Sequence, residues 1–469
     1  MKANRKYIYR FFIMGMVVLL FSSCQLVNKY ESPEVNSQNL FRGGNPADTT
    51  TIADIPWSEY FKDEGLRALI SEGLTNNFDL RVAATRIKQA EANLTMARMA
   101  YFPDVALVGQ VQQTRFSMGN TGKDVLGYHN ETYTLGISAT WEADIWGKLN
   151  RQKRAQYAQF LNSHAYRNLV RTSLIANIAT TYYTLLAMDE QLKITKETVK
   201  LMEESTETMQ ALKDAGMLNA AAVEQSKALL YGTQTSIPDL ESQIRQMENS
   251  LSVMLGRKPD AVYRTSISTQ TVPTELKYGV PVQMLAKRPD VQQAELAFRS
   301  AFELVNAAQA SLYPSITLNT GSLIGYSATT LSKFFRPENI IANILGGITQ
   351  PIFAKKQLTG QLKIRKAQQE EALLTFEKTV LSASQEVSNI LYTYESSLRK
   401  NNTRSMQIES LEKAVDYTQE LLKAGVANYT EVLNAQQSLL QSQLGQVNDK
   451  LDQLQATVNL YRALGGGQD

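Results

Sequence analysis

The amino-acid sequence repeats itself, and this repeat constrains the fold more than any other feature. Two alanine-rich segments match at an offset of 211 residues, and the segments that follow match at an offset of 209. Several registers that recur in the same order exclude chance or shared amphipathic bias and indicate a tandem duplication. The clearest matches are Asp79 with Asp290, Phe102-Pro103 with Tyr313-Pro314, Ala215-Gly216 with Ala424-Gly425, and Asn219 with Asn428.

Each half predicts the same order of elements. An alanine-rich helix leads into a strand that begins at a proline, a polar glycine-bearing loop and a returning strand. A very long helix, an Ala-Gly turn and a second long helix follow. The first half places these elements at 77–101, 103–116, 117–130, 131–146, 147–213, 214–218 and 219–256. The second half places them at 288–312, 314–323, 324–339, 340–353, 356–423, 424–427 and 428–464.

The long helices carry heptad repeats. A sustained seven-residue step predicts helices that supercoil with neighbours rather than pack once on a globular core. Pro238 is the single exception and is expected to kink or divide its helix. A helix of about 67 residues is roughly 100 Å long. The heptad positions include Val223, Leu230, Ile237, Ile244 and Leu251, and Leu433, Leu440, Val447, Leu454 and Tyr461.

Residues 131–146 alternate between apolar and polar side chains, which predicts a strand with two different faces. A strand between lipid and water has this composition, but so does a half-buried strand of a soluble sandwich. On the first interpretation the lipid-facing residues are Tyr133, Leu135, Ile137, Ala139 and Trp141, and the pore-lining residues are Thr134, Ser138, Thr140, Glu142 and Asp144.

Two halves supply four strands, and four strands cannot close a membrane barrel, which needs about eight or more. An open sheet edge in lipid leaves backbone groups unpaired, so other subunits must complete the sheet. Two copies give eight strands and three give twelve, and the strand count does not choose between them.

The N-terminus predicts export. A basic patch precedes the apolar run Phe11–Phe21, which is too short to span a bilayer as a helix but suits a signal peptide. Cys24 is the only cysteine, so no disulfide within the chain is possible. Its position after Ser22-Ser23 resembles a bacterial lipoprotein signal, although Phe21 departs from the usual Leu; an ordinary secreted thiol is the alternative. Residues 1–23 are thus the predicted signal peptide and 24–57 a lipidated tether, with Gln25 resembling outer-membrane sorting.

Charge and residue inventory argue against several functions. Removing residues 1–23 takes away four basic and no acidic residues, which leaves 44 Lys and Arg against 45 Asp and Glu. Nucleic-acid binding therefore loses its compositional support. The two histidines, His129 and His164, have no partner at metal-ligand spacing, and no phosphate loop or nucleophile elbow is present. We expect no enzymatic activity, no cofactor and no metal site.

Several motifs resemble the TolC/OprM-type outer-membrane efflux proteins, in particular the lipoprotein branch that serves resistance-nodulation-division (RND) pumps. They are IPDLESQIRQMENSLSVMLGRKP, RPDVQQAE with a following SLYPS, and the terminal LYRALGGG. The resemblance covers nearly all of the chain after the signal peptide, although Gln468 replaces the family's terminal Trp. It implies a mainly α fold with a β-barrel portion: a homotrimer with a twelve-stranded outer-membrane barrel on a long α-helical barrel that extends into the periplasm. A periplasmic adaptor and an inner-membrane RND pump are the implied partners, and small molecules the exported cargo.

The resemblance also bears on the two helical turns. It implies that residues around them form the adaptor-docking tips, whereas an ordinary αα-turn is the alternative. Relatives carry a gate aspartate where this chain has Gly425-Val426-Ala427, so Asp416 is only a possible gate residue. The candidate docking residues are Lys213, Asp214, Gly216, Asn219, Lys423, Gly425, Asn428 and Tyr429.

The sequence as a whole favours a passive export conduit lipid-anchored in the outer membrane of a Gram-negative bacterium. The alternative function is the outer-membrane channel of a type I secretion system or of a heavy-metal export system. A periplasmic scaffold without a pore is disfavoured by the two-faced strands, and a lipid-anchored hydrolase by the missing nucleophile and base. The expected domains are residues 58–257 for the first repeat, 258–287 for a connecting segment and 288–469 for the second repeat.

Overall fold

The computed structural model describes residues 29–34, 51–115, 129–273 and 286–468. Cys24 and most of the predicted 117–130 loop lie outside these residues. The chain forms two compact units, and each takes equivalent parts of both repeats. The strand unit comprises Met1–Pro33, Ile87–Ser163 and Ala294–Phe376, and the helix unit comprises Glu34–Arg86, His164–Gln293 and Glu377–Asp469.

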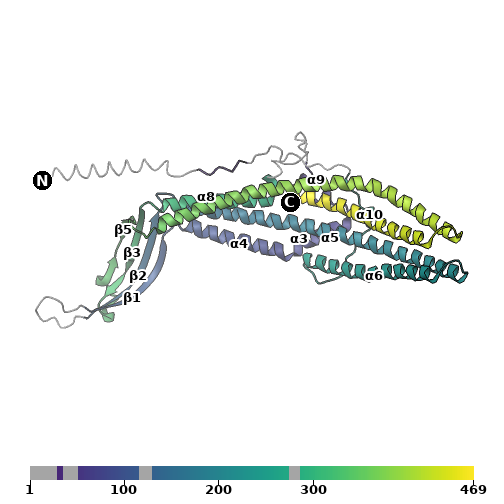
Figure 1. The fold of residues 1–469 in the computed structure, drawn as a ribbon. Helices are drawn as coiled ribbons and strands as arrows, with labels where there is room; N and C mark the ends of the chain where they lie inside the picture. Colours follow the sequence, from purple (N-terminus) through teal and green to yellow (C-terminus); the bar gives the residue numbers. More distant parts are fainter. Residues whose placement is uncertain (1–28, 35–50, 116–128, 274–285, 469) are drawn as a thin grey trace. The chain divides into compact units, whose positions relative to one another are not determined.

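The strand unit contains an antiparallel sheet in the order β1-β2-β3, with β4 and β5 both paired to β3 (Figure 1). The first two strands end within three residues of their predicted limits. The third is longer than the predicted 314–323, and the predicted fourth strand, 340–353, is divided in two. The strands are β1 (Asp104–Arg115), β2 (His129–Ala143), β3 (Ser315–Ala328), β4 (Ile340–Ala342) and β5 (Leu345–Thr349).

An irregularity in β3 accounts for this difference. Ile137 pairs with Ile324, but Ala139, two residues along β2, pairs with Thr320, four residues along β3. Two extra residues therefore bulge from β3, and such bulges bend a strand and interrupt its pairing. The outer partner divides at the same level, since β4 pairs with residues 324–326 and β5 with residues 315–319.

Six long helices form three pairs, and the two members of each pair have equivalent bounds in the two repeats. The first and the fourth are related by the offset of 211 residues at both ends, and the other four are related in pairs by the offset of 209, which confirms the duplication. The helices are α4 (Phe78–Met99), α5 (Lys148–Asp214), α6 (Ala220–Met254), α8 (Pro289–Ala310), α9 (Gln357–Lys423) and α10 (Tyr429–Ala463). Shorter helical segments are η2 (Ile52–Asp54), α2 (Trp57–Tyr60), α3 (Glu64–Asn76), η3 (Ile267–Thr269), η4 (Leu331–Lys333) and η5 (Pro337–Asn339).

Pro238 does not divide its helix, because α6 continues through it. The proline is exposed on the helix surface. Water can therefore satisfy the carbonyl group that a proline leaves without an amide partner four residues earlier.

The core of the helix unit lies around the middle of α5. Ile178, Tyr182 and Leu185 are fully buried there with Leu66 and Ile70 of α3. Tyr60 stacks on Tyr461 of α10 at a centroid distance of 4.3 Å. Burial of this apolar surface is the main stabilising contribution in the unit.

Candidate channel wall and docking tips

The register of the sheet assigns each paired strand residue to one of two faces, because directly paired residues share a face. Leu107, Ile137, Ile324 and Ala342 form one cross-strand row. The parity predicted from β2 alone therefore extends across the sheet. The apolar residues of this face are Val105, Leu107, Val111, Tyr133, Leu135, Ile137, Ala139, Trp141, Ile316, Leu318, Ile324, Tyr326, Ala328, Ile340, Ala342 and Ile348.

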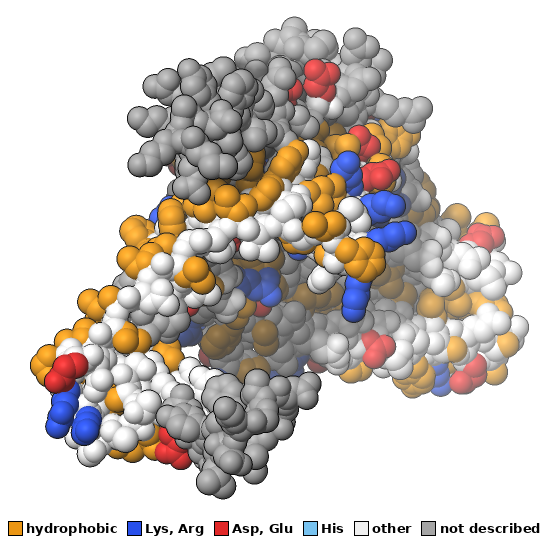
Figure 2. All heavy atoms as spheres, turned by 90° about the vertical axis from the view of Figure 1, so that its left-hand side faces the viewer, with side chains coloured by type: hydrophobic (Ala, Val, Ile, Leu, Met, Phe, Trp, Pro, Cys, Tyr) orange, Lys and Arg blue, Asp and Glu red, His pale blue; other side chains and the backbone are white. Residues whose placement is uncertain are grey.

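This apolar face is open in a single chain. Leu107 is 74% exposed, Val111 68%, Ile324 58% and Ile348 66%. Figure 2 looks from the strand side of Figure 1 and shows apolar side chains on the surface with few charged groups among them. A soluble sandwich would bury such a face, since contiguous apolar surface of this kind marks contact with membrane or protein. The sandwich alternative is therefore wrong for the described strands.

Aromatic side chains stand at both ends of the apolar face. At one end, Trp141 donates its indole N–H to the carbonyl of Tyr101 at 2.8 Å, and Trp146 stacks on Tyr313 at 5.1 Å. At the other end, the Tyr326 ring lies 5.5 Å from the Phe335 ring. Membrane strands place aromatic girdles at the two interfaces in this way.

The opposite face of the sheet is polar. Thr134 pairs with Gln110 and Ser327, and Thr140 pairs with Asp104 and Asn319. Ser138 lies on the same face and donates to the carbonyl of Ala106 at 3.4 Å. Hydroxyl, amide and carboxylate groups thus line this side, as a water-filled lumen requires.

The two carboxylates at the end of β2 have different roles. Glu142 lies on the polar face and forms an ion pair with Lys148 at 2.5 Å. Asp144 lies one residue beyond the strand, so the predicted strand end at residue 146 is wrong, and its place in the pore lining stays a prediction. Its carboxylate accepts the backbone N–H groups of Leu149 and Asn150 at 2.8 Å each, in the first turn of α5. A carboxylate satisfies unpaired amides and complements the helix dipole there.

The two helical turns are built alike. Gly216 and Gly425 have φ values of 74° and 73°, the left-handed conformation that glycine adopts without strain. At the first turn, the Met217 amide donates to the carbonyl of Leu212 at 2.8 Å, which is the Schellman pattern. Asn219 then caps α6 by accepting the Ala222 amide at 3.0 Å, and Asn428 caps α10 in the same way through Thr430 at 3.2 Å.

The turns of one chain pack on each other. Met209 and Val223 of the first hairpin are buried with Leu422 and Val432 of the second, and Tyr429 is partly buried against them. Charged groups surround this cluster. Lys213 lies 3.6 Å from Asp214, and Lys423 lies 2.9 Å from Glu420. The structure thus brings all eight predicted docking residues to one set of adjoining tips.

Asp416 is exposed on α9, about two helical turns before the second tip. Its neighbour Tyr417 is 65% exposed. Nothing in the described residues assigns Asp416 a lumen or a gate, so its role remains a prediction.

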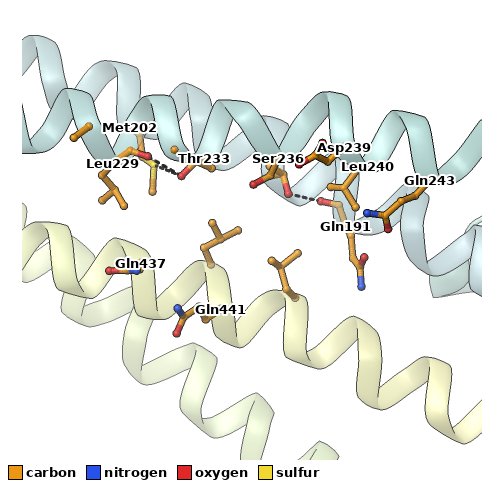
Figure 3. Close-up of a pocket in the computed structure, with 15 residues that line it drawn as sticks. Gln191, Met202, Leu229, Thr233, Ser236, Asp239, Leu240, Gln243, Gln437 and Gln441 are labelled. Carbon is orange, nitrogen blue, oxygen red and sulfur yellow. Dashed lines mark hydrogen bonds between the residues drawn. The ribbon is translucent and has the colours of Figure 1, made fainter.

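A groove of about 570 Å³, lined by both apolar and polar side chains, lies between α10 and the helices α5 and α6 in the helix unit (Figure 3). Gln437 and Gln441 project into it from α10, opposite Thr233 and Ser236 of α6. Thr233 donates to the sulfur of Met202 at 3.4 Å. Heptad spacing predicted apolar contacts along these helices, and the heptad residue Leu440 lines the groove together with glutamine, serine and threonine side chains.

The N-terminal segment is fixed to α8, a contact that the sequence did not reveal. The Tyr30 ring lies 5.6 Å from the Phe302 ring and under the Arg299 guanidinium at 5.4 Å. Ser32 donates to Glu295 at 2.6 Å. Burial, followed by the nearby Glu295 carboxylate, raises the pKa of Tyr30 to about 12. In the sequence, the signal for this contact is the aromatic residue Tyr30 within the predicted tether.

Two further observations concern the described residues as a set. None of their helices combines the length and the apolarity that a membrane-spanning helix requires. Nor do they contain a group of three or more His, Cys, Asp or Glu side chains arranged for a metal ion.

The family model for "Outer membrane efflux protein" matches residues 69–257 and 280–466, once for each repeat. The chain is 29% identical over 470 residues to the probable efflux pump outer membrane protein TtgC of Pseudomonas putida, covering 97% of this chain and 95% of TtgC. It is 27% identical over 459 residues to the cation efflux system protein CusC of Escherichia coli K12, covering 96% and 98%.

Solved structures share this fold. A CusC crystal structure has a TM-score of 0.80 at 26% identity, covering 95% of this chain and all of that one. The open-state MtrE outer membrane channel of Neisseria gonorrhoeae has a TM-score of 0.82 at 24% identity, covering 95% and 99%. The second likeness concerns the fold alone.

Proposed function

The chain belongs to the outer membrane efflux protein family and is an efflux channel of the outer membrane; from this premise we propose that three copies close one twelve-stranded barrel. Each copy contributes a sheet with two open edges, β1 on one side and β4 with β5 on the other. Open edges are not tolerated in lipid, so neighbouring copies must pair them.

The two-faced sheet is the observation that carries this proposal. Its exposed apolar face, with aromatic groups at both ends, suits the lipid side of a barrel wall. The polar face, which holds Thr134, Ser138, Thr140 and Glu142, suits the lumen. The conduit is passive, and the inner-membrane pump selects the cargo.

The adjoining tips are the proposed docking surface for a periplasmic adaptor, which links the channel to an RND-type pump. Their exposed apolar groups, Met217 at 54% and Val426 at 74%, stand among lysines and carboxylates. Apolar anchors with a charged rim are typical of protein interfaces.

Lipidation of Cys24 is the proposed second attachment to the outer membrane. Two acyl chains hold a protein at a membrane firmly, whereas a single chain holds it reversibly. Cys24→Ser should abolish incorporation of labelled palmitate while much of the exported protein still inserts through its strands. Continued labelling of the variant would disprove lipidation at this residue.

Mass measurement and conductance test the function. Protein purified in detergent should have the mass of a trimer and should open steady ion-conducting pores in planar bilayers. A monomer that inserts no pores would overturn the proposal. Cys24→Ser protein is the control, because it should conduct like the wild type.

A further inference from the structure

The chain leaves two large apolar side chains almost fully open directly beyond its last strand. Ile352 is 98% exposed and Phe353 is 83% exposed. Two exposed lysines, Lys355 and Lys356, follow them, and α9 begins at the next residue. These four residues belong to the strand unit and are called the junction segment below.

The junction segment begins at the level of one aromatic end of the apolar face. The side-chain amide of Gln350 donates to the carbonyl of Leu312 at 3.2 Å, and Trp146 donates its indole N–H to the carbonyl of Pro314 at 2.7 Å. An offset of 209 residues carries Trp146 onto Lys355. The segment therefore lies where the apolar face ends and where aromatic side chains meet lipid headgroups.

The same part of the chain carries a run of positive charge. No acidic residue occurs between Glu338 and Glu370. The cations between them are Lys355, Lys356, Lys363, Arg365 and Lys366. Within the described part of the chain, none of the ion pairs includes any of these cations.

The start of α5, the equivalent helix of the first repeat, is different. Arg151 forms an ion pair with Glu303 at 2.7 Å, and the Lys153 ammonium lies 4.9 Å from the centre of the Tyr101 ring. The first repeat thus supplies partners for its cations from within the chain. The second repeat leaves its cations open to a partner from outside.

We infer that the junction segment binds an anionic phospholipid, of the phosphatidylglycerol type, in the leaflet nearest the helices. Ile352 and Phe353 contact the acyl chains, and the ammonium groups of Lys355 and Lys356 contact the phosphate. Lysine stems lie along apolar surface while their charged ends reach the polar region, and basic clusters beside a membrane segment attract anionic lipid. The inference rests on the proposed function and names the lipid class that the channel wall prefers.

The backbone of the two lysines agrees with a role for their side chains. Lys355 and Lys356 have φ values of 49° and 61°, in the left-handed region that favours glycine. An offset of 209 residues relates Lys356 to Gly147, whose φ is 74°. Glycine would form this turn with less strain, so the turn itself does not require lysine.

Lipid binding to the purified channel tests the inference. Lys355→Gly with Lys356→Gly removes both charges and suits the backbone, so this double variant should fold at least as well as the wild type. Native mass spectrometry with equal amounts of phosphatidylglycerol and phosphatidylcholine should show a several-fold preference of the wild type for phosphatidylglycerol. The glycine double variant should lose most of this preference, whereas Lys355→Arg with Lys356→Arg should keep it.

Two controls establish the site and the source of the anion. Lys200→Ala with Lys258→Ala removes two exposed lysines of the helix unit and should leave the preference unchanged. Inorganic phosphate should not displace the lipid, because it lacks the acyl chains that the junction segment contacts. Ile352→Ser with Phe353→Ser should weaken retention of both lipids.

The outcomes separate the two proposals. A glycine double variant of normal mass that keeps the wild-type preference would overturn the lipid site and leave the channel proposal intact, as would displacement of the lipid by inorganic phosphate. Dissociation of this variant without loss of the preference would show that the lysines join copies, and would also overturn the lipid site. A wild-type chain that forms no pores would overturn the channel proposal, whereas loss of the preference in the glycine variant would still support the lipid site.

Discussion

Asn77 binds the end of a helix 177 residues away: its side-chain amide donates to the carbonyl of Met254 at 2.9 Å. Arg288, the equivalent residue of the second repeat, donates to the carbonyl of Ala463 at 2.7 Å. Both contacts join the start of a repeat to the last turn of that repeat's final helix. The duplication has therefore kept a tertiary contact while exchanging an amide for a guanidinium.

Asn77→Ala should destabilise the helix unit. The residue is 5% exposed and also accepts the Leu80 amide at 3.1 Å, so the variant loses the cap of α4 and the bond to Met254. A loss of about 1–3 kcal/mol is expected for groups left unpaired in a buried site. Thermal unfolding in detergent measures it.

Asn77→Asp separates the two contacts. It keeps the acceptor for Leu80 but has no donor for Met254, and it sets a negative charge at the carbonyl end of α6. The melting temperature of this variant should therefore also lie below that of the wild type. Thr75→Ala, at an exposed site one residue before the end of α3, is the control and should change little. Wild-type stability of Asn77→Asp would show that the bond to Met254 is unimportant.

The long-range contacts could not be predicted from the sequence, although the elements could. Matching offsets placed most helix ends within two residues, because both halves conserve their turns and heptads. Alternation along β2 gave the correct faces but not the end of the strand, since Asp144 fits the polar parity and yet caps α5. The bulge in β3 was also missed, because a bulge depends on a partner strand and leaves no periodic pattern in its own.

Side-chain pairs between helices were hidden for a related reason. Arg151 and Glu303 are 152 residues apart, and each looks like an ordinary surface charge in its own heptads. Only the packing of α8 on α5 buries them. The repeat could have suggested the contact, since neither residue has a charged equivalent in the other half.

Asp63 should make the helix unit sensitive to acid. Burial alone would raise the pKa of its carboxyl group, but hydrogen bonds from Thr265, the Leu66 amide and Gln270 outweigh burial and hold the pKa below its ordinary value. A carboxyl group with a lowered pKa contributes stability above its unfolded pKa, near 3.8, and loses it as the pH falls through the folded value.

Asp63→Asn tests this dependence. The variant should melt below the wild type between pH 7 and pH 5, and the difference should shrink as the pH falls below about 4. Glu64→Gln changes the neighbouring carboxylate, which is 92% exposed, and should show little difference throughout. A constant difference for Asp63→Asn down to pH 3 would contradict the assignment.

Ile137→Arg should block assembly of the channel. The side chain lies in the middle of the apolar face, where a charge in lipid costs about 2–4 kcal/mol for each copy. Thr134→Arg lies on the polar face of the same strand and should assemble normally while changing conductance and ion selectivity. Heat-resistant oligomers on gels report assembly. Equal assembly of the two variants would show that the assignment of the faces is wrong.

The tips should bind the adaptor directly. Cysteines at Asn219 or Asn428 should crosslink in cells to cysteines in the helical hairpin of the cognate adaptor. Because both asparagines cap helices, their replacement costs about 1 kcal/mol each. Met217→Cys and Val426→Cys are therefore the better probes: both are exposed, and neither side chain caps a helix. Met217 also lies against Gly425, so the probes report on both turns.

The control for this experiment is Tyr263→Cys, which is 84% exposed on the segment between α6 and α8 and lies outside the tip cluster. It should give no adaptor adduct at equal expression. Replacing Lys213 and Lys423 by Glu reverses two charges at the tips and should weaken docking of the adaptor. The loss should be larger at low salt, because salt screens charge effects at exposed sites. Adducts at Tyr263→Cys but never at the tip cysteines would place the docking surface elsewhere on the helix unit. Adducts at the tips alone, lost on charge reversal, would establish these turns as the contact through which the pump reaches the channel.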